Sequence, residues 1–133
     1  MTKKLSKKII RKRLMKECWS LVKEIVQAPE SCLCYTCDKI LEDPFERQAG
    51  HRYHGCLDFD LERNIRVQCV GCNKFRHGNL GEFERRLIKE FGIEWSDSLK
   101  ADALSKRNDY TIQELEAIKI KLSQQLSDVQ SRY

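Results

Sequence analysis

The chain has 133 residues, of which 41% are hydrophobic and 34% charged, so we expect one small domain with a helical appendage. No apolar run approaches the roughly 20 residues that span a bilayer, and the basic N-terminus lacks the apolar segment of a secretory signal. We therefore expect a cytoplasmic protein with no membrane partner. The formal net charge is +5, yet residues 1–16 alone carry eight Lys and Arg side chains and no acid. This segment predicts a polyanionic partner, with a solvated basic tail as the simpler alternative.

Apolar side chains recur every three or four residues between Leu14 and Ile25, which predicts an amphipathic helix over residues 4–27. Pro29 follows, and proline cannot continue the hydrogen-bond ladder of a helix. The sequence therefore predicts that residues 1–30 form a basic N-terminal helix. Cys18 has the position of a small apolar residue within it.

Two Cys-x-x-Cys pairs dominate the middle of the chain. Cys34 and Cys37 form the first, Cys69 and Cys72 the second, and 31 residues separate them. This spacing lets both thiolates of a pair reach one tetrahedral ion, so the four cysteines predict a structural zinc site. Cys32 is the one credible competitor for a ligand position.

The segment between the cysteine pairs contains short, mixed patterns. Residues 45–59 predict a β-hairpin or two short strands, and residues 64–68 continue into the second pair. After Cys72 we expect a helical turn over residues 73–77, which Gly78 ends.

Three helices are predicted after that turn. Asn79 and Glu82 have the spacing of a capping box, and Gly92 ends the helix that they begin. Residues 96–107 can form a short helix. Thr111 starts a further helix, predicted over residues 111–129, whose narrow apolar stripe packs either on this domain or on a second copy.

Residue types that cut phosphodiesters lie within the zinc frame. His51 follows Gly50 at an expected strand end, where a neutral imidazole can take a proton from an attacking water. Asn73 follows the last cysteine and His77 lies four residues later, so the two would share a helix face and could bind a divalent ion. Asn64 is placed to hold the histidine-bearing loop by hydrogen bonds. Each of these residues taken singly is more often structural.

The combined pattern resembles the zinc-framed HNH endonucleases, also called His-Me finger or ββα-metal nucleases. More closely, Arg47-Gln-Ala-Gly-His51, Asn64, Gln68-Cys-Val-Gly-Cys-Asn73 and Gly78-Asn79 resemble the phage NinG/Rap recombination endonucleases. The resemblance covers about residues 31–120. It implies a substrate of branched recombination intermediates, such as Holliday junctions and D-loops.

The resemblance also implies residue roles. His51 would be the general base, Asn64 the asparagine that orients its loop, and Asn73 with His77 the ligands of a catalytic Mg²⁺ or Mn²⁺. One position departs from the wider group, because Gly50 stands where many members have an Asp or His ligand. The ion would then depend on His77 or on one of three other residues: His54, Asp58 or Asp60.

The sequence thus predicts an α+β fold with a small zinc-stapled ββα-metal (His-Me finger) core. Residues 31–92 would form the nuclease core, between the N-terminal helix and a mostly helical C-terminal segment, residues 93–133. A symmetric homodimer would suit two coordinated cuts in a junction, with the 14–26 or 111–129 face as the interface. The predicted contacts with DNA phosphates are Lys7, Lys8, Arg11, Lys12, Arg47, Arg52, Lys74 and Arg76.

Two other functions remain open on the sequence alone. A zinc-ribbon DNA-binding or adaptor protein without catalysis would explain the missing ligand at Gly50. An HNH enzyme that nicks duplex DNA would keep the chemistry and change the target. Metal-dependent cleavage separates the first alternative from a nuclease, and a preference for branched over linear DNA separates the second.

Overall fold

The computed structural model describes residues 5–105 and 109–132. Helix α1 (Lys7–Gln27) begins at Ser6, whose hydroxyl accepts a hydrogen bond from the backbone N–H of Ile9. The predicted helix is confirmed from Lys7 onward, and its expected first residue, 4, lies outside the described residues. None of the helices in the described part of the chain is both long and apolar enough to cross a membrane.

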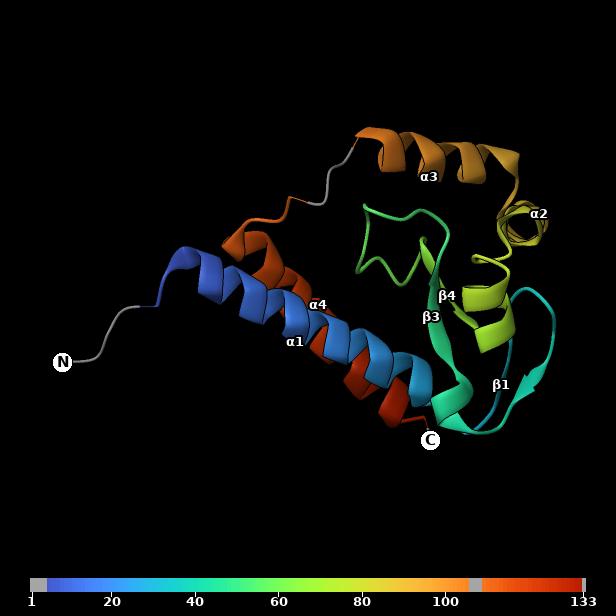
Figure 1. The fold of residues 1–133 in the computed structure, drawn as a ribbon, viewed down its shortest axis with the longest axis horizontal. Coiled ribbons are helices and arrows are strands. Elements are labelled where there is room, and N and C mark those ends of the chain that lie inside the picture. Colours follow the sequence, from blue (N-terminus) through green and yellow to red (C-terminus); the bar gives the residue numbers. More distant parts are fainter. Residues whose placement is uncertain (1–4, 106–108, 133) are drawn as a thin grey trace.

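Helix α4 (Ile112–Gln130) packs along α1, although the two are far apart in the sequence (Figure 1). The predicted capping box is confirmed, since Thr111 and Glu114 exchange side-chain to backbone hydrogen bonds. Cys18 lies fully buried between the two helices, and the core that they share also contains Val22, Leu115 and Leu122. The two faces offered above as a dimer interface therefore pack on each other within one chain.

Two small antiparallel sheets make up the β structure. Strand β1 (Cys32–Leu33) pairs with β2 (Ile40–Leu41), and β3 (Gln48–His51) pairs with β4 (Ile65–Gln68). The prediction of two strands within residues 45–59 is wrong, because β3 is the one strand there and its partner comes from beyond the loop. A short helical turn, η1 (Pro44–Glu46), precedes β3.

The second cysteine pair leads into a π-helical turn, η2 (Gly71–Phe75), followed by α2 (Leu80–Phe91) and α3 (Ile93–Ser105). Gly92 ends α2 at a φ of 96°, as predicted. Helix α3 starts three residues earlier than expected, and residues 106–107 of the predicted helix lie outside the described residues.

The predicted capping box before α2 is wrong. Asn79 has a left-handed backbone with a φ of 47°, and its side chain makes no hydrogen bond to the start of the helix. Its amide instead donates to the sulfur of Cys72 at 3.7 Å, and Glu82 pairs with Arg85 and Arg86.

The β3–β4 hairpin lies between two layers, with α1 and α4 on one side and η2, α2 and the β1–β2 unit on the other (Figure 1). The fold is thus mixed α and β, mostly helical, with two small sheets. Side chains on opposite faces of this hairpin enter different environments, and this determines how the candidate site is divided.

Candidate functional site

Four cysteine sulfurs converge beside the hairpin. The sulfur atoms of Cys34, Cys37, Cys69 and Cys72 all lie within 4.8 Å of one another. The sulfurs of Cys37 and Cys69 are 3.7 Å apart, close to the roughly 3.8 Å that a tetrahedral ion with Zn–S bonds of about 2.3 Å requires. The cysteines are free thiols, so no disulfide competes for them. Both the donor set and the spacing fit a structural zinc ion, and Cys32 lies outside the cluster.

The electrostatics of the cluster also suit a cation. Burial opposes ionisation of Cys34, but backbone hydrogen bonds around it lower the pKa of its thiol to about 6. Burial and the neighbouring thiols raise the pKa of Cys37 to about 12, and burial raises the pKa of Cys69. One thiolate therefore forms readily, whereas further thiolates need a positive charge among them.

Polar groups around the cluster orient its sulfurs. The hydroxyl of Thr36 is 3.6 Å from the sulfur of Cys34, and the backbone N–H of Cys72 donates to the sulfur of Cys69 at 3.4 Å. The amide of Asn79 donates to Cys72, as described above. Such hydrogen bonds stabilise thiolates and fix the ligand geometry.

The predicted role of Arg47 as a DNA contact does not fit its position, because the residue is only 3% exposed. Its guanidinium donates hydrogen bonds to three backbone carbonyls: Gln27 at the end of α1 at 3.1 Å, Pro29 just after it at 2.5 Å, and Leu41 in β2 at 2.9 Å. Arg47 therefore ties α1 to the zinc unit, and no side of it is left for a phosphate.

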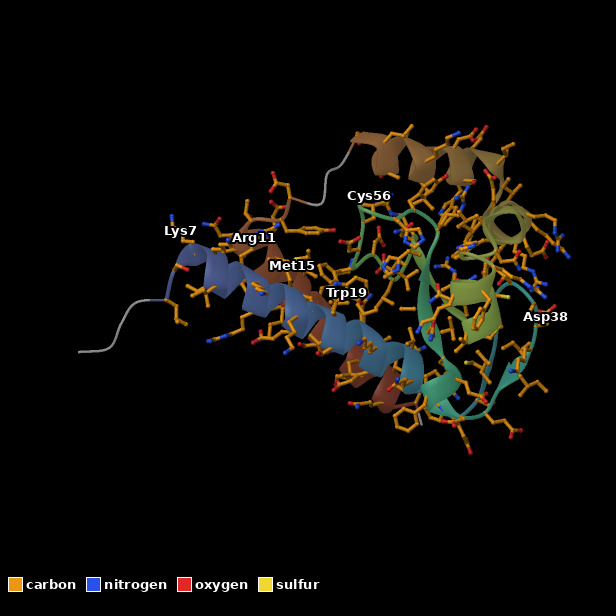
Figure 2. All side chains as sticks on the ribbon, in the orientation of Figure 1. Lys7, Arg11, Met15, Trp19, Asp38 and Cys56 are labelled. Atoms are coloured by element: carbon orange, nitrogen blue, oxygen red, sulfur yellow. The ribbon has the colours of Figure 1, made fainter. Side chains whose placement is uncertain are left out.

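His51 ends strand β3 and lies under the side chain of Trp19 from α1. The two rings are 5.1 Å apart in an edge-on arrangement, and His51 is 7% exposed. Figure 2 shows Trp19 extending from α1 on the side of the hairpin. The exposed ring of His54 lies 6.0 Å from that of His51. His51 is thus almost fully buried, with the rings of Trp19 and His54 as neighbours.

The environment of His51 favours its neutral form. Burial lowers the pKa of the imidazole below its usual 6.5, and this effect outweighs the hydrogen bond with the Asp58 carbonyl, which acts in the opposite direction. The Nε2 atom is 2.9 Å from that carbonyl oxygen. Because a carbonyl can only accept, this contact favours the tautomer with the proton on Nε2 and with Nδ1 as the acceptor nitrogen; a backbone hydrogen bond with Ala49 also raises the pKa of the ring.

Asn64 is fully buried and holds the loop that follows His51. Its Oδ1 accepts from the backbone N–H of Tyr53, and its Nδ2 donates to the carbonyls of Tyr53, Cys56 and Leu57. The same loop contains Asp58, the partner of His51. The expectation that Asn64 holds the histidine-bearing loop by hydrogen bonds is therefore confirmed.

Asn73 and His77 do not share a helix face. The π-helical turn ends at Phe75, and His77 lies beyond it with a positive φ of 50° and an exposed side chain. The amide of Asn73 donates to the side-chain oxygen of Gln48 at 2.7 Å. Since successive strand residues point to opposite faces, Gln48 and His51 face different layers. The structure thus places Asn73 and His51 on opposite faces of the hairpin.

The described residues contain no second group of three His, Cys, Asp or Glu side chains able to hold a metal ion; the cysteine cluster is the one that they form. Of the substitutes considered for the ligand missing at Gly50, Asp60 is paired with Arg63 at 2.9 Å and Asp58 is buried. A full donor set for a catalytic ion is therefore not assembled by this part of the chain.

Gln68 occupies the space that any side chain at position 50 would need. A Cβ atom on residue 50 would lie 1.9 Å from the Oε1 atom of Gln68. The Nε2 atom of Gln68 donates to the carbonyl of Gly78 at 2.8 Å and to the hydroxyl of Thr36 at 3.0 Å, and its Oε1 is buried without a partner. Sequence reasoning included Gln68 in a motif but missed this role, and also missed Trp19, since neither contact follows from local spacing.

The remaining predicted DNA contacts have different surroundings. Figure 2 shows Lys7 and Arg11 near the N-terminal end of α1. Arg11 donates to the carbonyl of Tyr110 at 2.7 Å, and Arg52 lies 3.4 Å from the carboxylate of Glu84. The other five are exposed at the surface: Lys7, Lys8, Lys12, Lys74 and Arg76.

Comparison with known proteins gives a consistent picture. A family model described as the bacteriophage lambda NinG protein matches residues 2–131. Among curated proteins, the chain is 42% identical over 73 residues to protein ninG of Salmonella phage P22, a match that covers 55% of this chain and 34% of that protein. It is 39% identical over 70 residues to protein ninG of Escherichia phage lambda, covering 53% of this chain and 33% of that protein.

Protein ninG of Escherichia phage 933W is 40% identical over 75 residues, covering 56% of this chain and 36% of that protein. The chain thus spans about a third of the length of the curated relatives that it matches. No solved structure gives a significant match.

Proposed function

The chain belongs to the NinG family of bacteriophage proteins, and we propose that it is an endonuclease that hydrolyses phosphodiester bonds in branched DNA. The proposal rests first on His51. Its imidazole is neutral near pH 7, because burial lowers the pKa, and its protonated nitrogen is fixed by the Asp58 carbonyl. These are the two properties that a general base needs: an acceptor nitrogen and a fixed direction.

In the proposed reaction, a water molecule attacks the phosphorus atom of the backbone and His51 takes its proton at Nδ1. The bond from phosphorus to the leaving sugar oxygen breaks, and solvent supplies the proton for that oxygen. Asn64 acts as a positioning residue, because it holds the loop that carries the Asp58 carbonyl.

The cysteine cluster has a structural role in this proposal. A zinc ion held by Cys34, Cys37, Cys69 and Cys72 would join the β1–β2 unit to the end of β4, across a small cluster whose buried members are three of these cysteines and Leu41. This cross-link would fix the hairpin that ends at His51. The stiffness of the site would then depend on the metal, although no cysteine takes part in the reaction.

The family resemblance implies a Mg²⁺ or Mn²⁺ ion in addition, with Asn73 among its ligands. Because the described residues assemble no complete donor set, we derive no step through that ion. Branched DNA as substrate, the homodimer and action in the cytoplasm of the host cell are parts of the proposal that depend on the resemblance. The chain spans about a third of its relatives, so each also depends on the whole protein.

A second candidate function has one observation in its favour. Since the described residues form no second metal cluster, a zinc-scaffolded DNA-binding protein without catalysis would have everything that it needs. Against it, His51, Asn64 and Asn73 occur in the order that the resemblance to the zinc-framed nucleases implies. An enzyme that nicks linear duplex DNA would share the site and differ in substrate.

The test is cleavage of a labelled four-way junction beside linear duplex of matching sequence, with Mg²⁺, with Mn²⁺ and with neither. We expect metal-dependent cutting of the junction, lost in His51→Ala, while junction binding, zinc content and the circular dichroism spectrum are kept. His54→Ala is the comparison variant, because that ring is a close but exposed neighbour.

Loss of cutting in His54→Ala with activity kept in His51→Ala would show that His54 is the base and that the proposed role of His51 is wrong. Tight junction binding without cutting under any metal would leave the binding protein as the function. Equal cutting of linear duplex would favour the nicking enzyme.

A further inference from the structure

Phe75 is a large apolar side chain that the fold leaves almost uncovered. It is 79% exposed, at the last position of η2, and no ring contact involves it among the described residues. Burying a phenyl ring is favourable, so an isolated ring held in water is available for a ligand to cover.

The backbone under Phe75 is held firmly. The N–H of Arg76 donates to the carbonyl of Gly71 at 2.9 Å, and the N–H of Gly78 donates to the carbonyl of Cys72 at 2.9 Å. Cys72 itself belongs to the cysteine cluster, and Asn73 is bonded to Gln48 in β3. The ring is therefore displayed by a turn anchored to the proposed zinc ion and to the hairpin, and little order must be gained on binding.

The residues next to Phe75 in the sequence are positively charged. Lys74 and Arg76 flank it, both are exposed, and neither forms an ion pair with any described residue. No acidic residue occurs from Asn73 to Asn79. A partner that covers Phe75 must therefore offer negative charge on both sides of a flat or apolar group, which disfavours an apolar protein groove and suits a nucleotide.

We propose that Phe75 stacks on a nucleobase exposed at the branch point of DNA, while Lys74 and Arg76 contact the adjoining phosphates. This inference rests on the proposed function and names a residue that determines its substrate preference. In linear duplex the faces of the bases are covered by their neighbours, whereas at a branch point the end of a stack is open. An aromatic platform thus favours branched DNA without reading base edges.

The chain contains a matched control in Phe45. This residue is 83% exposed and also lies on a short helical turn, η1, but its neighbours are Asp43, Pro44 and Glu46. If exposed phenyl rings bound DNA merely by being apolar, both residues would matter. If the ring must lie between cationic side chains to bind DNA, only Phe75 would contribute to binding.

The experiment measures binding to a four-way junction and to linear duplex without added Mg²⁺ or Mn²⁺, for wild type, Phe75→Ala, Phe75→Trp and Phe45→Ala. A 2-aminopurine placed at the branch point reports base stacking by its fluorescence. We expect Phe75→Ala to weaken junction binding about 10-fold or more, with duplex binding nearly unchanged and the fluorescence change lost. Phe75→Trp should restore both, and Phe45→Ala should match wild type.

Junction binding and fluorescence that are the same in wild type and Phe75→Ala would overturn the inference while leaving the proposed nuclease intact. An equal loss in Phe45→Ala would overturn it as well. If the wild-type chain binds neither DNA, the proposed function fails, and the role of Phe75 fails with it.

Discussion

The side-chain oxygen of Gln68 lies where a side chain on Gly50 would have to be. A Cβ atom added to Gly50 would approach that oxygen to 1.9 Å, and hydrogen bonds to Gly78 and Thr36 hold the Gln68 amide in place. A flip would place its oxygen against the Gly78 carbonyl, which now accepts its N–H at 2.8 Å. The glycine before His51 and the glutamine on the facing strand therefore form one packing unit.

Restoring an acid at position 50 should destabilise the protein. We expect Gly50→Asp to lower the free energy of unfolding by about 1–3 kcal/mol, because overpacking forces the hairpin apart. In a Gln68→Ser background the same change should cost less, since the amide is gone. Urea unfolding of the two single variants and the double variant measures the coupling energy between positions 50 and 68. Gly81→Asp is the control, since a Cβ there meets nothing within 4 Å. Additive effects at positions 50 and 68 would contradict the packing unit.

The metal site allows a test with two neighbouring cysteines. Cys34→Ser should lose the bound zinc and unfold the β1–β2 unit, because it removes one of four convergent sulfurs. Cys32→Ser should keep one zinc ion per chain, since Cys32 lies in β1 outside the cluster. Metal content by mass spectrometry and the circular dichroism spectrum give the answer. Zinc lost equally in both variants would show that the cluster extends to Cys32.

The parts of the fold that sequence predicted best depend on local spacing. The cysteine pairs, the Thr111 capping box and the stop at Gly92 each follow from residues within a few positions of one another. Asn79 has the right spacing for a cap and fails as one, because its amide is drawn to the sulfur of Cys72, seven residues back. Local pattern cannot show such competition from tertiary contacts.

Tertiary contacts also explain why some predicted site residues do not lie together in the structure. The expected pairing of Asn73 with His77 assumed an α-helix, whereas the turn is π-helical and ends between them. Arg47 has the same charge as the surface arginines. The spacing of residues in the sequence does not show which guanidinium binds backbone carbonyls at the end of α1 and which is exposed to solvent. The hydrogen bonds of Asn64 to the loop could be predicted from the sequence, because their partners lie only 7–11 residues away.

The burial of Arg47 predicts that its replacement lowers the stability of the protein. Arg47→Ala should lower the free energy of unfolding by about 3 kcal/mol, since it removes the guanidinium donor from the buried Leu41 carbonyl and from the partly buried Pro29 carbonyl. Arg47→Lys should recover only part of this loss, because one ammonium cannot reach the same set of acceptors. The exposed Arg76→Ala is the control and should change stability by less than about 0.5 kcal/mol. Equal effects in denaturant unfolding of Arg47→Ala and Arg76→Ala would contradict the structural role.

The burial of His51 predicts how its charge varies with pH. Burial lowers the pKa of the imidazole below 6.5, so we expect a midpoint below that value when the ring proton resonances are followed by NMR. In the unfolded chain the ring binds a proton more readily than in the folded chain. The neutral ring therefore contributes stability that is fully present above pH 6.5 and is lost as pH falls through the lower folded pKa.

The same midpoint should appear in catalysis if His51 is the base. The rate of junction cleavage should rise with pH through the NMR midpoint and level off near pH 7, because the neutral ring is then fully populated. Trp19→Ala exposes the ring and should move both the NMR midpoint and the acid limb of the rate profile toward 6.5. If the acid limb of the rate profile stays in place in Trp19→Ala while the NMR midpoint of His51 moves, another group takes the proton.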